Sequence, residues 1–181
     1  GTFGTSLIIA GSDQYPGAAY LSGVSAYRIG SGLVTLAVPE GIYSGLIKSL
    51  PEATFVILED DQGGIGPGGY QQVKTALDRP TACLIGPGLG TRSGTGKFLE
   101  DLIKIAGLPK LVVDADGLRL LTRISNWQQI LPRGSLLTPH PGEMAALTGL
   151  SINEIQKDRL GVTERFAVEW NQVILLKGAH T

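Results

Sequence analysis

Short apolar runs alternate along the chain with longer stretches in which apolar residues recur every three or four positions. Nearly continuous hydrophobicity over a few residues predicts strands that are covered on both faces, as in a parallel sheet. The longer recurrence predicts amphipathic helices between these strands. The expected strands are Ser6–Ala10, Leu33–Val38, Thr54–Leu58, Ala82–Ile85, Lys110–Asp114, Ser135–Leu137 and Val173–Leu176.

The alternation of strands and helices predicts the fold class. It favours an α/β fold with a doubly wound, mostly parallel sheet and helices on both faces, formed by a single domain over residues 1–181. Ser151 and Glu154 form a capping-box pattern that opens the last helical segment, and we expect a break in that segment near Gly161. The expected helices are Ala18–Ile29, Lys97–Ala106, Gly142–Thr148 and the stretch from Ser151 to about Trp170.

Composition excludes several classes of protein. Fifteen Lys and Arg residues against sixteen Asp and Glu leave a net charge of −1, so no basic excess points to a nucleic acid or an acidic membrane surface. A hydrophobic share of 43% against 17% charged residues excludes a disordered chain. One cysteine, Cys83, cannot form an internal disulfide and is expected to be inert core. No apolar run approaches the ~20 residues of a membrane span, which favours a cytoplasmic domain.

Ligands of open α/β sheets gather outside the carboxyl ends of the strands, so the loops that follow strands are the candidate site. The loop after the first strand brings small residues, including Ala18, to a helix N-terminus, where N–H groups can face an anion. The loop Gly86–Thr91 misses the dinucleotide fingerprint because Thr91 stands where the third glycine belongs. It remains a close-approach glycine loop, suited to an anion or a sugar. For the loop after the first strand the alternative is a turn that allows close packing of helix and sheet.

Charged residues follow three of the other strands. Asp114 and Asp116 would be costly if buried without partners; Asp116 is expected to cap the next helix, and Asp114 to orient a ligand or Mg²⁺. Two prolines fix the backbone around His140, which favours ligand binding there over an ordinary surface histidine. Glu143 either complements the helix dipole or helps to hold a hydrated Mg²⁺. Lys177 suits a phosphate, or else reaches solvent from a strand end.

Taken together, these loops resemble the ADP/ATP-dependent NAD(P)H-hydrate dehydratase family, whose fold is ribokinase-like. The resemblance implies repair of hydrated NADH and NADPH: a nucleotide phosphorylates the added hydroxyl, and elimination of phosphate restores the dihydronicotinamide. The form Thr-Pro-His-Pro-Gly-Glu resembles that of bacterial members, which use ADP, whereas eukaryotic members use ATP. The matching stretches are Gly1–Ser12, Tyr15–Ala19, Ala26–Leu36, Gly86–Gly90, Val113–Leu118, Leu137–Glu143 and Leu176–Thr181.

The resemblance also implies roles for particular residues and partners. Asp114 and Glu143 occupy places used around Mg²⁺ and phosphate in ribokinase-like enzymes. A homo-oligomer such as a tetramer, and a fused or separate epimerase, are implied as well. Hydrate-binding positions correspond to Ala18, Gly88, Gly90 and His140, and positions that contact the ADP or ATP donor correspond to Lys177, Gly178, Ala179, His180 and Thr181.

One departure from the family pattern concerns the catalytic group. Family members continue with a Gly-x-Gly-Asp segment whose aspartate is expected to activate the substrate hydroxyl, and no segment of residues 1–181 reproduces it. We therefore expect the domain to be incomplete at its C-terminus, the catalytic residue to lie beyond Thr181, and these residues alone to be poorly active. Two alternatives to the dehydratase stay open: a ribokinase-like small-molecule kinase of the hydroxymethylpyrimidine type, and a noncatalytic nucleotide-binding module.

Overall fold

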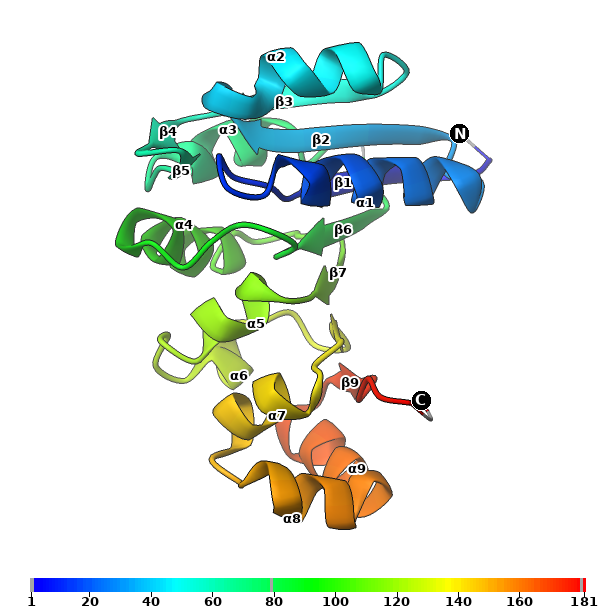
Figure 1. Ribbon diagram of the computed structural model, residues 1–181, viewed down its shortest axis with the longest axis vertical. Coiled ribbons are helices and arrows are strands. Elements are labelled where there is room, and N and C mark those ends of the chain that lie inside the picture. Colours follow the sequence, from blue (N-terminus) through cyan, green and yellow to red (C-terminus); the bar gives the residue numbers. More distant parts are fainter. Residues whose placement is uncertain (1, 79, 180) are drawn as a thin grey trace.

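A computed structural model describes residues 2–78, 80–179 and 181 of the chain. Within these residues seven parallel strands form one sheet in the order β3-β2-β1-β6-β7-β8-β9, and β4 and β5 form a separate antiparallel pair (Figure 1). The strands are β1 (Thr5–Ile9), β2 (Leu33–Pro39), β3 (Thr54–Leu58), β4 (Asp60–Asp61), β5 (Gly64–Ile65), β6 (Ala82–Ile85), β7 (Lys110–Val113), β8 (Leu136–Leu137) and β9 (Val173–Ile174). The predicted parallel α/β fold and all seven predicted sheet strands are confirmed.

Helices fill the connections between the strands. None of the helices within the described residues is long and apolar enough to cross a membrane. The helices are α1 (Pro16–Arg28), α2 (Glu40–Ser49), α3 (Gly69–Thr75), α4 (Ser93–Ile103), α5 (Asp116–Leu121), α6 (Trp127–Ile130), α7 (Pro141–Thr148), α8 (Ile152–Lys157) and α9 (Arg159–Trp170).

Two local expectations need amendment. The segment after Ser151 breaks at Asp158 and not near Gly161, because the Asp158 carboxylate accepts a hydrogen bond from the Gly161 N–H at 3.0 Å and so caps the start of α9. Helices α2, α3 and α6 are not among the expected elements. Gly41 and Gly45 weaken the helical propensity of α2, which forms because Ile42 and Leu46 bury one side of it against the sheet.

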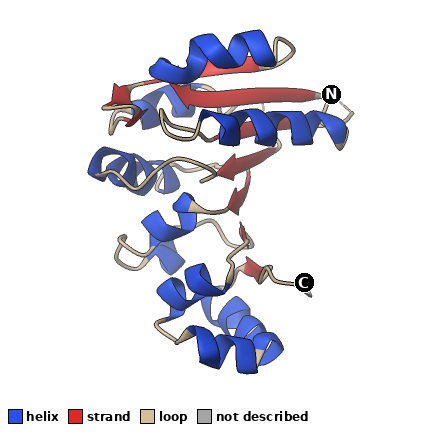
Figure 2. Cartoon of the chain, in the orientation of Figure 1, coloured by secondary structure: helices blue, strands red, loops and turns tan. Residues whose placement is uncertain are grey.

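The order of the strands decides which face each helix covers. From the centre of the sheet, β1, β2 and β3 follow one another toward one edge, and β6, β7, β8 and β9 follow one another toward the other edge. Because crossovers between parallel strands are right-handed, the helices of these two halves lie on opposite faces of the sheet. The buried residues divide accordingly: Ile8 belongs to a cluster with residues of α1 and α2, whereas Ile9 and Ile85 belong to a second cluster with residues of α3 to α9. Figure 2 shows the strands in a single column with helices beside it.

On the α1 side, half-buried Leu84 and Val112 of β6 and β7 border a hollow of about 590 Å³.

Strand register brings the ends of five strands to one level. Ile9 of β1 pairs with Ile85 of β6, which pairs with Val113 of β7. Val113 pairs with Leu137 of β8, and Leu137 with Ile174 of β9. Because all these strands are parallel, the loops that follow them leave the sheet at the same edge.

Cys83 lies within β6 and is only 1% exposed. Burial raises the pKa of its thiol to about 12, so the thiol stays protonated at neutral pH. The prediction that Cys83 is buried core is confirmed.

Gly86 marks the closest approach between two of these loops. It follows β6 with a φ of +129°, and a Cβ built there would lie 1.8 Å from the carbonyl oxygen of Asp114. Neither backbone segment can yield without moving a strand end. Glycine is therefore required at this position for both its backbone conformation and its lack of a side chain.

Substitution of Gly86 tests this packing. We expect Gly86→Ala to lower the free energy of unfolding by about 3 kcal/mol, because strain and overlap act together. Gly30→Ala is the matched control, since Gly30 also has a positive φ, +105°, but no atom lies within 4 Å of its added Cβ. We expect it to cost only about 1–2 kcal/mol. Urea unfolding followed by circular dichroism gives both values, and equal losses would contradict the close approach.

Candidate functional site

The loops after β1 and β6 are joined directly. The Gly11 N–H donates to the carbonyl of Pro87 at 2.8 Å, and the Ser12 hydroxyl donates to the carbonyl of Gly88 at 2.8 Å. A Cβ on Gly88 would lie 2.6 Å from the Cβ of Ala18 at the start of α1. The glycine loop can lie against α1 only because Gly88 lacks a side chain. The structure thus brings the predicted positions Ala18 and Gly88 together.

Asp116 joins the glycine loop to the loop after β7. Its Oδ2 accepts a hydrogen bond from the N–H of Gly90 at 2.9 Å. The prediction that Asp116 caps the following helix is wrong: Ala115 is the N-cap, and Asp116 is the first residue of α5. Ala115 has a φ of +51°, a strained conformation for a residue with a side chain. This sharp turn at the end of β7 sets the start of α5, from which Asp116 reaches Gly90.

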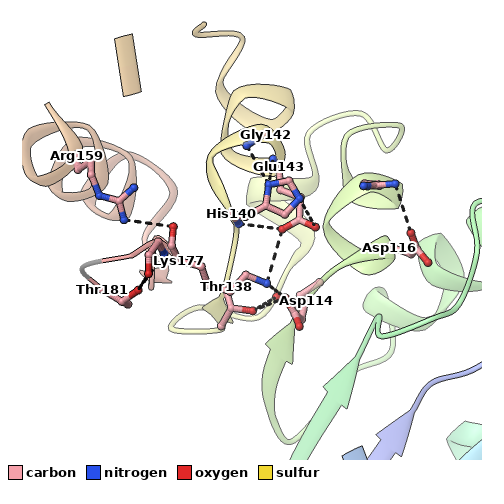
Figure 3. A network of polar contacts seen from close by, with 12 residues as sticks. Asp114, Asp116, Thr138, His140, Gly142, Glu143, Arg159, Lys177 and Thr181 are labelled. Carbon is pink, nitrogen blue, oxygen red and sulfur yellow. Dashed lines mark hydrogen bonds and ion pairs between the residues drawn. The ribbon is translucent and has the colours of Figure 1, made fainter. Parts of the chain in front are cut away.

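Lys177 joins the loops after β7, β8 and β9. Oδ1 of Asp114 accepts hydrogen bonds from the Thr138 hydroxyl at 2.8 Å and from Lys177 Nζ at 2.5 Å (Figure 3). The same Nζ lies 3.9 Å from Oε2 of Glu143. Asp114 and Lys177 both keep about a third of their side-chain surface exposed, whereas Glu143 is 5% exposed. One ammonium group therefore balances two carboxylates that come from different loops.

His140 is held rigidly at the start of α7. Its Nδ1 accepts hydrogen bonds from the N–H groups of Gly142 and Glu143 at 3.0 and 3.3 Å, and Oε2 of Glu143 accepts from the His140 N–H at 2.9 Å. This is a capping box in which an imidazole stands in for the usual hydroxyl. Because Nδ1 accepts, a neutral ring carries its proton on Nε2, which lies 3.2 Å from Oε1 of Glu143. The ring remains 46% exposed, so it can still contact a ligand.

Arg159 orders the backbone of the predicted nucleotide-binding stretch. From α9 its Nη2 donates to the carbonyls of Leu176 and Lys177 at 2.8 and 3.3 Å. A Cβ on Gly178 would lie 2.7 Å from this guanidinium, so a larger residue there would displace the Arg159 side chain. The stretch ends in a turn where Thr181 Oγ1 accepts from the N–H of Gly178 at 2.9 Å.

Ala179 and His180 are the other members of the predicted nucleotide-binding stretch. Ala179 is exposed beside this turn, and the predicted position His180 lies outside the described residues. Arg159 and Thr138 are participants that the sequence analysis missed. Thr138 directly follows β8, so the rule that places ligands at strand ends could have found it. No local pattern marks Arg159, which lies 18 residues before Lys177.

Asp114 and Glu143 are hard oxygen donors of the kind that Mg²⁺ prefers. Within the described ranges no group of three or more His, Cys, Asp or Glu side chains could hold a metal ion. Mg²⁺ commonly takes one or two carboxylates together with substrate phosphates, so this pair suits an ion that arrives with a nucleotide. Lys177 already occupies Oδ1 of Asp114, and its positive charge would compete with the ion.

The capping role of His140 can be separated from a ligand-binding role. We expect His140→Ala to lower the free energy of unfolding by about 1 kcal/mol, because two backbone N–H groups lose their acceptor. His140→Asn supplies a new acceptor and should restore most of that loss. Thermal unfolding of both variants provides the measurement. Equal destabilisation by Ala and Asn would contradict the capping role.

Comparison with known proteins gives the relatives of this chain. It is 37% identical over 186 residues to the bifunctional NAD(P)H-hydrate repair enzyme of Moorella thermoacetica, covering 100% of this chain and 34% of that protein. It is 33% identical over 183 residues to the ADP-dependent (S)-NAD(P)H-hydrate dehydratase of Bacillus subtilis, covering 100% of this chain and 60% of that protein. The chain thus spans about a third of the length of the first relative and less than two thirds of the second.

Solved structures agree with these sequence relatives. The crystal structure of the Bacillus subtilis ADP/ATP-dependent NAD(P)H-hydrate dehydratase, co-crystallised with ATP/Mg²⁺ and soaked with CoA, superposes with a TM-score of 0.75 at 34% identity, covering 98% of this chain and 60% of that one. A ribokinase-like superfamily protein from Enterococcus faecalis, at 24% identity, gives a TM-score of 0.79 over 97% of this chain and 58% of that one, and shows the fold alone. The NAD(P)H-hydrate dehydratase family model matches residues 6–181. The chain therefore belongs to the NAD(P)H-hydrate dehydratase family.

Proposed function

We propose that this chain provides the substrate and nucleotide sites for ADP-dependent dehydration of hydrated NADH and NADPH. The observation that carries the proposal is the series of contacts at one edge of the sheet: Ala18 packs on Gly88, Gly90 of the same loop bonds to Asp116, and Asp114, two residues earlier, bonds to Lys177. Family membership supplies the chemistry: the nucleotide phosphorylates the hydroxyl added to the ring, and loss of phosphate restores the dihydronicotinamide.

The two ends of this series suit different ligands. Ala18 and the glycine loop leave backbone and small side chains at the surface, which favours close approach of the hydrated dinucleotide. His140 adds a ring whose orientation is fixed by its capping bonds. Lys177 offers a compact positive charge, the residue type that binds phosphate as a point charge. We therefore propose that the phosphate donor binds at Lys177, Gly178, Ala179, His180 and Thr181.

Asp114 and Glu143 would hold Mg²⁺ only together with phosphate oxygens of the donor. The ion would neutralise charge on the transferring phosphoryl group. The part played by this chain is to orient Asp114 through Thr138 and to fix Glu143 through His140. The group that takes the proton from the substrate hydroxyl is expected outside residues 1–181.

The partners of the proposed reaction follow from the same relatives. We propose that an epimerase, fused or separate, acts together with this chain, which the bifunctional name of the Moorella thermoacetica relative supports. A homo-oligomer and a cytoplasmic location remain predictions of the sequence analysis.

The activity is tested with the protein expressed from its complete reading frame. We expect NADPH hydrate, ADP and Mg²⁺ together to restore the absorbance of the reduced nicotinamide, and omission of ADP or chelation of Mg²⁺ to abolish the recovery. Phosphorylation of hydroxymethylpyrimidine in place of this recovery would favour the small-molecule kinase. Binding of ADP without turnover of either substrate would favour a noncatalytic module.

Lys177→Gln tests the nucleotide end of the site. The amide can still donate to Asp114, but the positive charge is gone, so we expect the Kd for ADP to rise at least about tenfold. Lys48→Gln, on the exposed side of α2, is the matched control and should leave the Kd unchanged. Isothermal titration calorimetry measures both. An unchanged Kd in Lys177→Gln would place the donor elsewhere.

A further inference from the structure

A second, basic hollow lies beside the proposed site, between α5 and the start of α7. Its volume is about 410 Å³, and its walls include Arg119, Arg123 and the side chain of His140. Arg119 lies in α5 and Arg123 in the turn that follows it, where the Arg123 N–H donates to the carbonyl of Leu120 at 3.0 Å, and both side chains line the hollow. The hollow thus combines two permanent positive charges with one fixed imidazole ring.

Positive charge predominates where the arginines face this hollow. Arg123 donates from Nη1 to the carbonyl of Thr91 at 2.6 Å and forms no ion pair with any described residue. Arg119 is 57% exposed, and its one acidic neighbour, Asp116, lies 3.9 Å away and already accepts from Gly90. A guanidinium has five N–H donors, so both arginines keep several for an anion. Their planar groups suit phosphate in particular.

Glu143 also lines the hollow, but its carboxylate oxygens already contact His140. It is 5% exposed, and its two oxygens contact the backbone N–H and the Nε2 of His140. Lys177 lies 3.9 Å from Oε2, whereas the imidazole Nε2 approaches Oε1. The buried carboxylate thus contacts His140 on the wall of the hollow through one oxygen and approaches Lys177, which does not line the hollow, through the other. This arrangement argues for two separate anion positions.

The hollow borders both segments proposed to bind the hydrated dinucleotide. Arg123 is bonded to Thr91, which directly follows Gly90 of the glycine loop. His140 forms the opposite wall (Figure 3 shows its ring beside Glu143). We propose that Arg119 and Arg123 bind a phosphate group of the dinucleotide substrate, a site that rests on the proposed function and deepens it. The group is either the diphosphate, present in both hydrates, or the 2′-phosphate of NADPH hydrate.

The test uses the Arg119→Gln/Arg123→Gln double variant of the protein expressed from its complete reading frame. Titration calorimetry with NADPH as the probe should show a Kd at least about tenfold higher than in the unchanged protein. The Kd for ADP should stay within about twofold. Arg165→Gln is the matched control, because Arg165 is an exposed arginine of α9, paired with Glu169 and remote from the hollow. Arg119→Lys/Arg123→Lys keeps the charge and should give an intermediate Kd.

The outcomes separate the two proposals. NADH as a second probe distinguishes the phosphates: equal weakening indicates the diphosphate, and weakening for NADPH alone indicates the 2′-phosphate. An unchanged Kd for both dinucleotides, no measurable binding to the unchanged protein, or a rise confined to ADP overturns the arginine site. Failure to restore NADPH hydrate despite arginine-dependent binding of NADPH would instead contradict the proposed function and leave the arginine site standing.

Discussion

In-register pairing of five parallel strands is the constraint on which the candidate site depends. Ile9, Ile85, Val113, Leu137 and Ile174 lie in one row across the sheet. Each is followed within two residues by a loop, so these loops begin at a common level although they are far apart in the sequence. A shift of one residue in any pair would turn that strand's buried side chains to the opposite face, and the core prevents it.

The site lies where the winding of the sheet reverses. Connections run outward from β1 on one side and from β6 on the other, so the loops that follow these two strands meet at a topological switch point. Gly88 packs directly on Ala18 at this point, and only a residue without a side chain allows it. Such points are where open α/β sheets bind ligands, which agrees with the role proposed for this loop.

The charged side chains at the carboxyl edge of the sheet are held in place by one another and by the backbone. Asp114 accepts from a hydroxyl and an ammonium group, Asp116 from a backbone N–H, and Glu143 from the backbone N–H of His140. Lys177 contacts two of these carboxylates, which fix the position of its ammonium group. An incoming phosphate would bind this ammonium group together with them. Anion binding in such a site needs little reorganisation, because the dipoles and charges are placed before the ligand arrives.

The sequence by itself determined the strands, most helices and the loops that bear the chemistry. The apolar run Ala82–Ile85 predicts its strand correctly, although the structure buries Cys83 and Ile85 and leaves Ala82 and Leu84 half-buried on the other face. Helices α2, α3 and α6 and the break at Asp158 were not predicted. Helix α2 depends on burial against the sheet, and the break depends on a single side-chain hydrogen bond. The tertiary structure alone decided that Asp116 accepts a hydrogen bond from Gly90, and that Arg159 donates to the carbonyl of Leu176, 17 residues later and just past β9. Such pairings depend on how distant strand ends meet in space, which no local pattern encodes.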